Sequence, residues 1–156
     1  MDHYWVADEA AKAEQERVLR RLCEVAIAHD LPVILHSRKA EAATFEVIRE
    51  MGVVKADFHC WGGKVKLAVK VAEHGYYFSI PPVVERAESF QALARKLPLE
   101  SLLTETDAPY MSPDRGERNE PANVPRAVRA IASARGEDEE SVRRSIRENF
   151  RRLFNH

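Results

Sequence analysis

The amino-acid sequence predicts an α/β protein built around a parallel sheet. Short runs rich in strand-forming residues alternate with longer amphipathic segments, and proline or glycine separates most of them. The chain has 156 residues, of which 45% are apolar, enough for one core and too few for two ordinary domains. Parallel strands need a crossover between them, so this alternation favours a parallel sheet in a single domain, residues 1–156, either open or closed into a barrel.

The first predicted helix spans residues 8–30. Its apolar side chains recur at helical spacing, at Val18, Leu22 and Val25, and also at Leu19 and Ala26. Pro32 ends this helix, and Val33–His36 then forms a short buried strand. Residues 39–51 follow as a second helix, which Gly52 closes.

The same alternation continues to the end of the chain. Strands are predicted at residues 56–60, 76–80 and 101–107, and helices at 64–74 and 86–97, the former closed by Gly75. A long loop over residues 108–123 leads into two final helices, at about 124–134 and 139–154. The last helix carries Val142, Ile146, Phe150 and Leu153 on one face.

The charge balance excludes a protein that binds nucleic acid through excess positive charge alone. The formal net charge is -1, which leaves open both a nucleic-acid partner and a small anionic substrate. Residues 115–152 are richer in arginine than in acids, a pattern for which a solvated helix face is the favoured explanation and phosphate contacts the second.

The sequence also predicts a reduced, cytoplasmic protein with no membrane segment. No run approaches the ~18 apolar residues of a membrane helix. The start, MDHYWVADEAAK, lacks the basic and apolar regions of a signal peptide. Cys23 and Cys60 are far apart and form no CxxC pair.

Three metal-capable residues lie at or near the last positions of predicted strands: His36, His59 and Asp107. In parallel α/β folds, functional groups gather at the carboxyl ends of the strands, so we expect these side chains to lie on one edge of the sheet. The alternative for each histidine is a buried imidazole that bonds a backbone carbonyl.

The run LLTETD sharpens this expectation. In a strand, Glu105 and Asp107 point to one face, where two like charges need a shared cation. Two imidazoles with a carboxylate suit Zn, Mn, Fe or, with more oxygen ligands, Mg. Such an ion makes hydroxide available near neutral pH, and Asp107 could both bind it and accept the proton of the water. Three ligands still make an incomplete site.

Several segments, in this order and spacing, resemble the TatD family of metal-dependent deoxyribonucleases. They are LPVILHSR, FHCWGG, LLTETDAPYMSP, RGERNEP and the terminal ENFRRLF, and the resemblance covers essentially the whole chain. It implies a (β/α)8 barrel with a site for two divalent metal ions (Mg, Mn or Zn). It also implies DNA as the substrate, with phosphodiester bonds cleaved by a metal-activated water.

The resemblance further implies roles for individual residues. His36 and His59 match histidines that bind one metal together with a bridging glutamate. Asp107 matches an aspartate that binds the other metal beside an HxH pair, and we take Asp107 and Glu105 as the catalytic residues. Glu105 is expected to position a ligand or the attacking water, the alternative being a structural ion pair with an arginine.

Residues predicted at the rim of this site are assigned to substrate binding. Arg38 and Arg118 can hold phosphate through two parallel hydrogen bonds. Asn119 is also a substrate-binding candidate. Its favoured role, shared with Glu120, is to order the loop.

The chain departs from the family pattern in several places. Gly62 stands where serine is frequent, and Pro81 and Pro82 stand where many members carry glycine. It contains neither an HxH pair nor the bridging glutamate, and Met1 stands where an internal leucine is expected.

The strand count agrees with these departures, because four strands are half of the eight in a complete barrel. The expectation is therefore the C-terminal half, strands five to eight, of a TIM-type (β/α)8 metal-dependent hydrolase barrel, N-terminally incomplete. Its unpaired edges favour self-association. Two other functions stay open: an amidohydrolase-type enzyme acting on C–N bonds, and a non-catalytic half-barrel fragment.

Overall fold

The computed structural model describes residues 1–154 and contains one sheet of four parallel strands. The strands are β1 (Val33–His36), β2 (Ala56–His59), β3 (Tyr77–Ile80) and β4 (Leu102–Thr104), in the spatial order β1-β2-β3-β4. This confirms the predicted α/β class with a parallel sheet.

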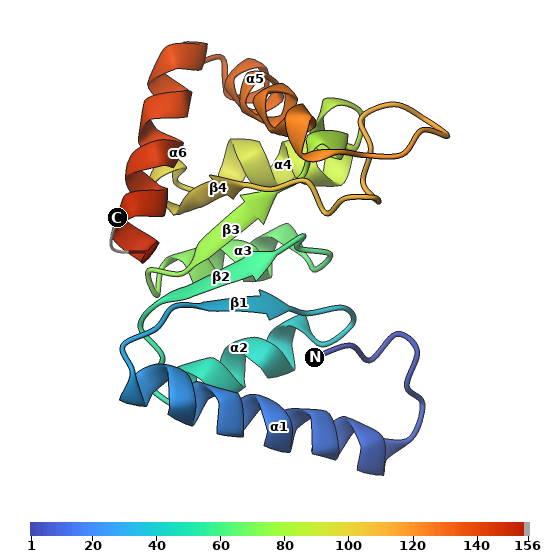
Figure 1. Cartoon of the computed structure of the whole chain (residues 1–156), viewed down its shortest axis with the longest axis vertical. Coiled ribbons are helices and arrows are strands. Elements are labelled where there is room, and N and C mark those ends of the chain that lie inside the picture. The colour runs from blue at the N-terminus through green and yellow to red at the C-terminus, as the bar shows by residue number, and fades with distance from the viewer. Residues whose placement is uncertain (155–156) are drawn as a thin grey trace.

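Helices connect the strands and cover one face of the sheet (Figure 1). The N-terminal segment and the long loop after β4 both lie beyond the ends to which the strands point. The α-helices are α1 (Glu9–Ala28), α2 (Glu41–Glu50), α3 (Val65–Ala72), α4 (Glu88–Lys96), α5 (Val124–Arg135) and α6 (Glu139–Phe154). Short 3-10 helices are η1 (Pro82–Glu85), η2 (Leu99–Ser101) and η3 (Pro121–Asn123).

Alternation along the strands divides the sheet into an apolar face and a polar face. Phe58 and Phe78 are paired across β2 and β3, and their rings stack with centroids 5.7 Å apart in the core beneath the helices. On the opposite face, Ile34 is 63% exposed and is in register with Asp57, two residues before the paired His36 and His59. The polar side chains of the sheet therefore gather away from the core.

The fourth strand is shorter than the predicted span of residues 101–107. η2 ends at Ser101, the first predicted position, and the backbone N–H of Glu105 makes the last hydrogen bond toward β3, to the Ile80 carbonyl at 3.3 Å. Asp107 has φ of 55°, a left-handed conformation that an extended strand does not contain. The chain turns out of the sheet there, so strand alternation does not extend to Asp107.

The first helix buries only part of its apolar stripe. Asp8 caps it through hydrogen bonds to the backbone N–H groups of Ala10 and Ala11, and its buried residues are Cys23 and Ala26. The predicted apolar residues Val18, Leu22 and Val25 are instead exposed. The surface that α1 packs against α2 therefore includes fewer residues than its apolar stripe.

Asn149 on α6 ties this last helix to β4. Its side chain is fully buried and donates hydrogen bonds to the carbonyls of Leu99, at 2.8 Å, and Leu102, at 2.7 Å. We expect Asn149→Ala to lower the free energy of unfolding by about 1–3 kcal/mol, because two buried carbonyls lose their donor. Urea denaturation followed by circular dichroism measures this, with exposed Arg144→Ala on the same helix expected to stay within about 0.5 kcal/mol. Equal effects of the two changes would contradict the anchoring role.

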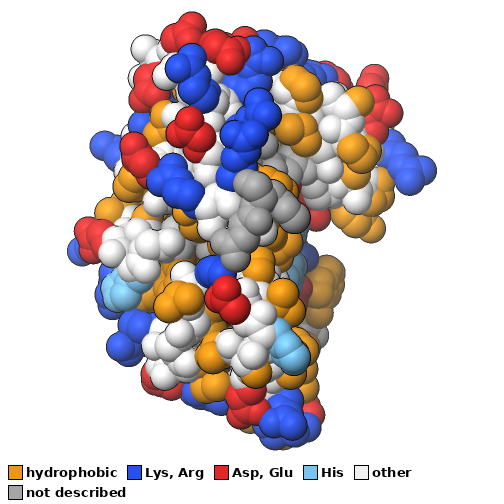
Figure 2. Space-filling model, turned by 60° about the vertical axis from the view of Figure 1, so that its left-hand side comes forward, with side chains coloured by type: hydrophobic (Ala, Val, Ile, Leu, Met, Phe, Trp, Pro, Cys, Tyr) orange, Lys and Arg blue, Asp and Glu red, His pale blue; other side chains and the backbone are white. Residues whose placement is uncertain are grey.

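Among the C-terminal arginines, Arg126, Arg135 and Arg143 form ion pairs with acids in the described residues, and the solvated helix face stays a prediction. Arg126 contacts both Glu85 and Asp114, and Arg143 contacts Glu140. Basic and acidic side chains are mixed over the upper part of the surface in Figure 2. Among residues 1–154, no helix has the length and apolar content needed to cross a membrane. The cytoplasmic location stays a prediction.

Candidate metal centre

The two histidines end neighbouring strands and are in register. His36 is the last residue of β1 and His59 the last of β2, and their ring centroids lie 6.0 Å apart. The predicted placement of both at the carboxyl edge is confirmed, and it follows from strand alternation and the parallel pairing of β1 with β2.

Glu105 orients His59. One of its carboxylate oxygens forms a short hydrogen bond with Nδ1 of His59, and the other accepts the backbone N–H of Cys60 at 2.8 Å. With Nδ1 held against a carboxylate, the second ring nitrogen, Nε2, lies 3.6 Å from Oδ1 of Asp107. This is the arrangement in which a carboxylate sets the tautomer of a metal-binding histidine. The alternative for Glu105, an ion pair with arginine, is not found among its contacts in the described residues.

The electrostatics of His59 are set by the same contact. The hydrogen bond to Glu105 raises the pKa of His59, against an opposing effect of desolvation, and the charge of Asp107 adds to the increase. An imidazole surrounded by carboxylates is a site that prefers a positive charge, whether a proton or a metal ion supplies it.

The residues present fit part of a metal site. Two ligand atoms that each lie about 2.1 Å from a tetrahedral ion are about 3.4 Å apart, close to the separation of His59 Nε2 and Asp107 Oδ1. Imidazole and carboxylate are also suitable ligand types for Zn, Mn or Fe. Within residues 1–154, however, no three His, Cys, Asp or Glu side chains converge on one point. The predicted three-residue set is therefore assembled only in its His59–Asp107 pair.

His36 has a different partner in this structure. Its Nε2 lies 3.1 Å from Oδ2 of Asp2. Desolvation acts to raise the pKa of Asp2, but the hydrogen bonds with His36 and with the backbone N–H of Tyr4 outweigh it, so this pKa is lowered. Asp2 was missed by the sequence reasoning, because nothing in the residue pattern indicates that a position so early in the chain returns to the end of β1.

His36, His59 and Asp107 line a cavity of about 760 Å³. Two polar atoms on its lining residues, Oγ of Ser37 and Nε1 of Trp61, are buried and have no hydrogen-bond partner among the described residues. The lining includes His36, Arg38, His59, Cys60, Gly62, Gly63, Asp107, Tyr110 and Met111.

The three substrate-binding candidates occupy different positions. Arg38 lines the cavity, whereas Arg118 is exposed on the long loop and is not among the lining residues. Asn119 is 2% exposed, donates to the Thr106 carbonyl at 2.6 Å and accepts from the side chain of Asn123 at 2.9 Å. This geometry supports the loop-ordering role of Asn119, and substrate contacts by all three residues stay predictions.

Asp57 was also missed, although the sequence carried a signal for it. It lies two residues before His59 on β2, so alternation places both on the polar face. It accepts a hydrogen bond from Oγ of Ser79 at 2.9 Å, while its Oδ1 has no partner among the described residues. Burial raises the pKa of Asp57 to about 6.

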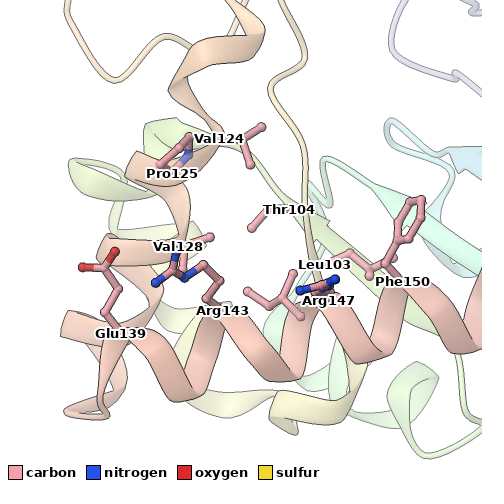
Figure 3. A pocket seen from close by; sticks show the side chains of 10 residues that line it. Leu103, Thr104, Val124, Pro125, Val128, Glu139, Arg143, Arg147 and Phe150 are labelled. Carbon is pink, nitrogen blue, oxygen red and sulfur yellow. The ribbon is translucent and has the colours of Figure 1, made fainter.

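A second cavity, of about 340 Å³, lies beside β4, the outermost strand on the side of the sheet opposite β1 (Figure 3). Leu103 and Thr104 of β4 form one side, and α5 and α6 form the other with residues that include Val128 and Phe150. The described residues lining it include no histidine, cysteine or aspartate, and Glu139 is the one carboxylate among them, so the His59–Asp107 pair belongs to the larger cavity.

The sequence of the chain is similar to known proteins. The family model described as TatD related DNase matches residues 1–155. The chain belongs to the TatD family. Among curated TatD relatives, a putative deoxyribonuclease, TATDN3 of Mus musculus, is 37% identical over 96% of this chain. An uncharacterized metal-dependent hydrolase of Methanocaldococcus jannaschii, MJ1582, is 34% identical over 96%.

The fold also agrees with a solved TatD structure. The crystal structure of YJJV, a TatD homologue from Escherichia coli K12, superposes with a TM-score of 0.89 at 27% identity and covers 100% of this chain. The match covers 61% of that protein, 51% of the mouse relative and 59% of the archaeal one. The chain therefore spans little more than half the length of these TatD relatives.

Proposed function

We propose that this chain takes part in the metal-dependent hydrolysis of DNA phosphodiester bonds. The observation that carries the proposal is the Glu105–His59–Asp107 arrangement, in which a carboxylate-oriented imidazole faces a second carboxylate across a metal-sized gap. Membership in the TatD family supports the same reaction class, since members are metal-dependent hydrolases and deoxyribonucleases.

His59 and Asp107 would hold a divalent ion, and the ring of His36 lies 6.0 Å from that of His59. When bound, such ions supply a hydroxide near neutral pH and neutralise charge on the phosphate. Mg, Mn and Zn are the candidates, with two ions in a complete site.

The chain's own residues would do the rest. Glu105 keeps the His59 ring in the orientation that directs Nε2 at Asp107, so the ligand pair is formed before substrate arrives. Asp107 can accept a proton from a water held beside it. Arg38, at the same cavity, can bind a phosphate oxygen with its guanidinium.

The four strands would be the last four of an eight-stranded barrel of the TIM type, since their parallel order and connecting helices fit that architecture. The outer edges of β1 and β4 are then pairing surfaces for other strands, from another part of a longer chain or from a second molecule.

The test of this function is a hydrolysis assay with matched substrates. The purified chain is incubated with end-labelled DNA, or with a cyclic amide, in the presence of Mn²⁺, Mg²⁺ or EDTA. We expect DNA cleavage that requires metal and is absent in EDTA. Hydrolysis of the amide alone would favour the C–N alternative, and no metal binding together with no activity would favour the non-catalytic fragment.

Glu105→Gln is expected to weaken Mn²⁺ binding and DNA hydrolysis by about 10–100-fold, because the neutral amide no longer polarises the imidazole of His59. Isothermal titration of Mn²⁺ and initial hydrolysis rates measure the two effects. Glu100→Gln, at an exposed position outside the cavity, serves as the matched control and should change neither quantity. If Glu105→Gln behaved like this control, the orienting role would be wrong.

A further inference from the structure

Exposed aromatic side chains surround the mouth of the larger cavity. Trp5 is 75% exposed and Tyr110 is 71% exposed, and both are among its lining residues. Tyr4, beside Trp5, is 48% exposed. Large aromatic rings at a surface indicate a binding region when they gather around a functional cavity.

The rings near the N-terminus are held in place. The guanidinium carbon of Arg38 lies 3.8 Å from the centroid of the Tyr4 ring and 5.5 Å from that of Trp5. The Tyr4 and Trp5 rings meet edge to face, with centroids 4.6 Å apart. The backbone beneath them is fastened to the end of β1, because the N–H of His3 donates to the Arg38 carbonyl at 2.8 Å. The surface is thus ordered before any ligand binds.

We propose that Trp5, supported by Tyr4 and Arg38, stacks an unpaired nucleobase next to the phosphate that is cleaved, with Tyr110 contacting a neighbouring base. This inference rests on the proposed function and names the part of the substrate that the rim recognises. The rim combines flat rings with a guanidinium, the two elements by which proteins hold single-stranded nucleic acid.

Charge supports a stacking mechanism over a purely electrostatic one. The chain has a formal net charge of -1, and Asp107 and Glu105 lie beside the cavity, so phosphate attraction alone gives little affinity. Contact between an aromatic ring and the face of a base does not depend on charge. In a duplex the faces of internal bases are covered by their neighbours, so an unpaired base is the matching ligand.

The two tryptophans allow a direct test without catalysis. Trp61 is 2% exposed, whereas Trp5 is exposed, so quenching of the red-shifted emission reports on Trp5. The natural chain is titrated, with EDTA present to remove metal ions, with an oligonucleotide of eight thymidine nucleotides. A second titration uses an abasic oligonucleotide of the same length and charge. We expect saturable quenching by the first, and at least about fivefold weaker binding of the second.

Variants then locate the contact by fluorescence anisotropy of a labelled thymidine oligonucleotide. Trp5→Ala is expected to weaken binding about tenfold and Trp5→Phe only slightly, because phenylalanine retains a stacking face. Tyr110→Ala should weaken binding to a smaller extent. Val54→Ala removes another exposed apolar side chain outside this cavity and should have no effect.

Equal affinity for the two oligonucleotides, or an unchanged affinity of Trp5→Ala, would overturn the inference. Base-dependent binding through Trp5 without hydrolysis under any metal would instead leave the inference standing and refute the proposed function. Metal-dependent hydrolysis together with equal binding of the thymidine and abasic oligonucleotides would support the proposed function and overturn the inference about Trp5.

Discussion

Asparagine in place of Asp107 is expected to lower metal-supported DNA hydrolysis by more than about 100-fold. The reason is that Asp107 would contact the ion itself, whereas the groups that only orient a ligand are worth about 10–100-fold. Asparagine retains the shape of the side chain but loses its charge, and thereby both its attraction for the cation and its capacity to accept a proton. Values of kcat/KM on a labelled oligonucleotide, with the affinity for Mn²⁺ measured separately, show the size of the loss.

The matched control is Asp138→Asn, because Asp138 is exposed at the start of α6 and its hydrogen bond to the Ser141 backbone N–H can also be made by asparagine. This variant should retain the activity of the natural chain. Hydrolysis that survives Asp107→Asn at the natural rate would mean that the His59–Asp107 pair is not the metal site.

The second large effect concerns stability, and Asp57 is its source. Burial raises the pKa of Asp57 to about 6 in the folded chain, above its ordinary value of 3.8. Between these two pH values the folded state holds the proton more tightly than the unfolded state does. Stability is therefore lost as pH rises through about 6, and the buried carboxylate costs about 3 kcal/mol at pH 8.

Asp57→Asn should remove this dependence. We expect the variant to exceed the natural chain in free energy of unfolding by about 3 kcal/mol at pH 8, and to match it closely at pH 4. Urea denaturation in EDTA at a series of pH values measures the difference, with Asp138→Asn as the exposed control. If the difference in free energy of unfolding between the two chains did not change with pH, the pKa of Asp57 would not differ between the folded and unfolded states.

Much of the candidate site follows from local rules. His36 and His59 end short apolar runs, and parallel strands bring their last residues to one edge, so their proximity was predictable from alternation and order alone. Asp57 obeys the same rule and could have been found with it, since it lies two positions before His59. The parallel sheet itself followed from the alternation of strands and helices.

Other features depend on how the chain packs. The sequence predicts a strand through Asp107, yet the backbone leaves the sheet after β4, and Glu105 reaches His59 from beyond the strand. The apolar stripe of α1 was correctly found, but its burial was not, because the extent of a helix contact depends on what lies against it. The pairing of Asp2 with His36 joins residues 34 positions apart and has no local signal.

The amino-acid sequence by itself determined the class of fold, the edge of the sheet at which the metal-capable residues meet, and the family to which the chain belongs. The fold class and the edge follow from the periodicity and order of residues, and the family follows from short motifs. All of these can be read from residues close together in the chain. Only the tertiary structure decided which nitrogen of His59 faces Asp107, which carboxylates are buried, and that Trp5 and Tyr110 share one cavity. Such features depend on distances between segments far apart in the chain, and no local pattern encodes those distances.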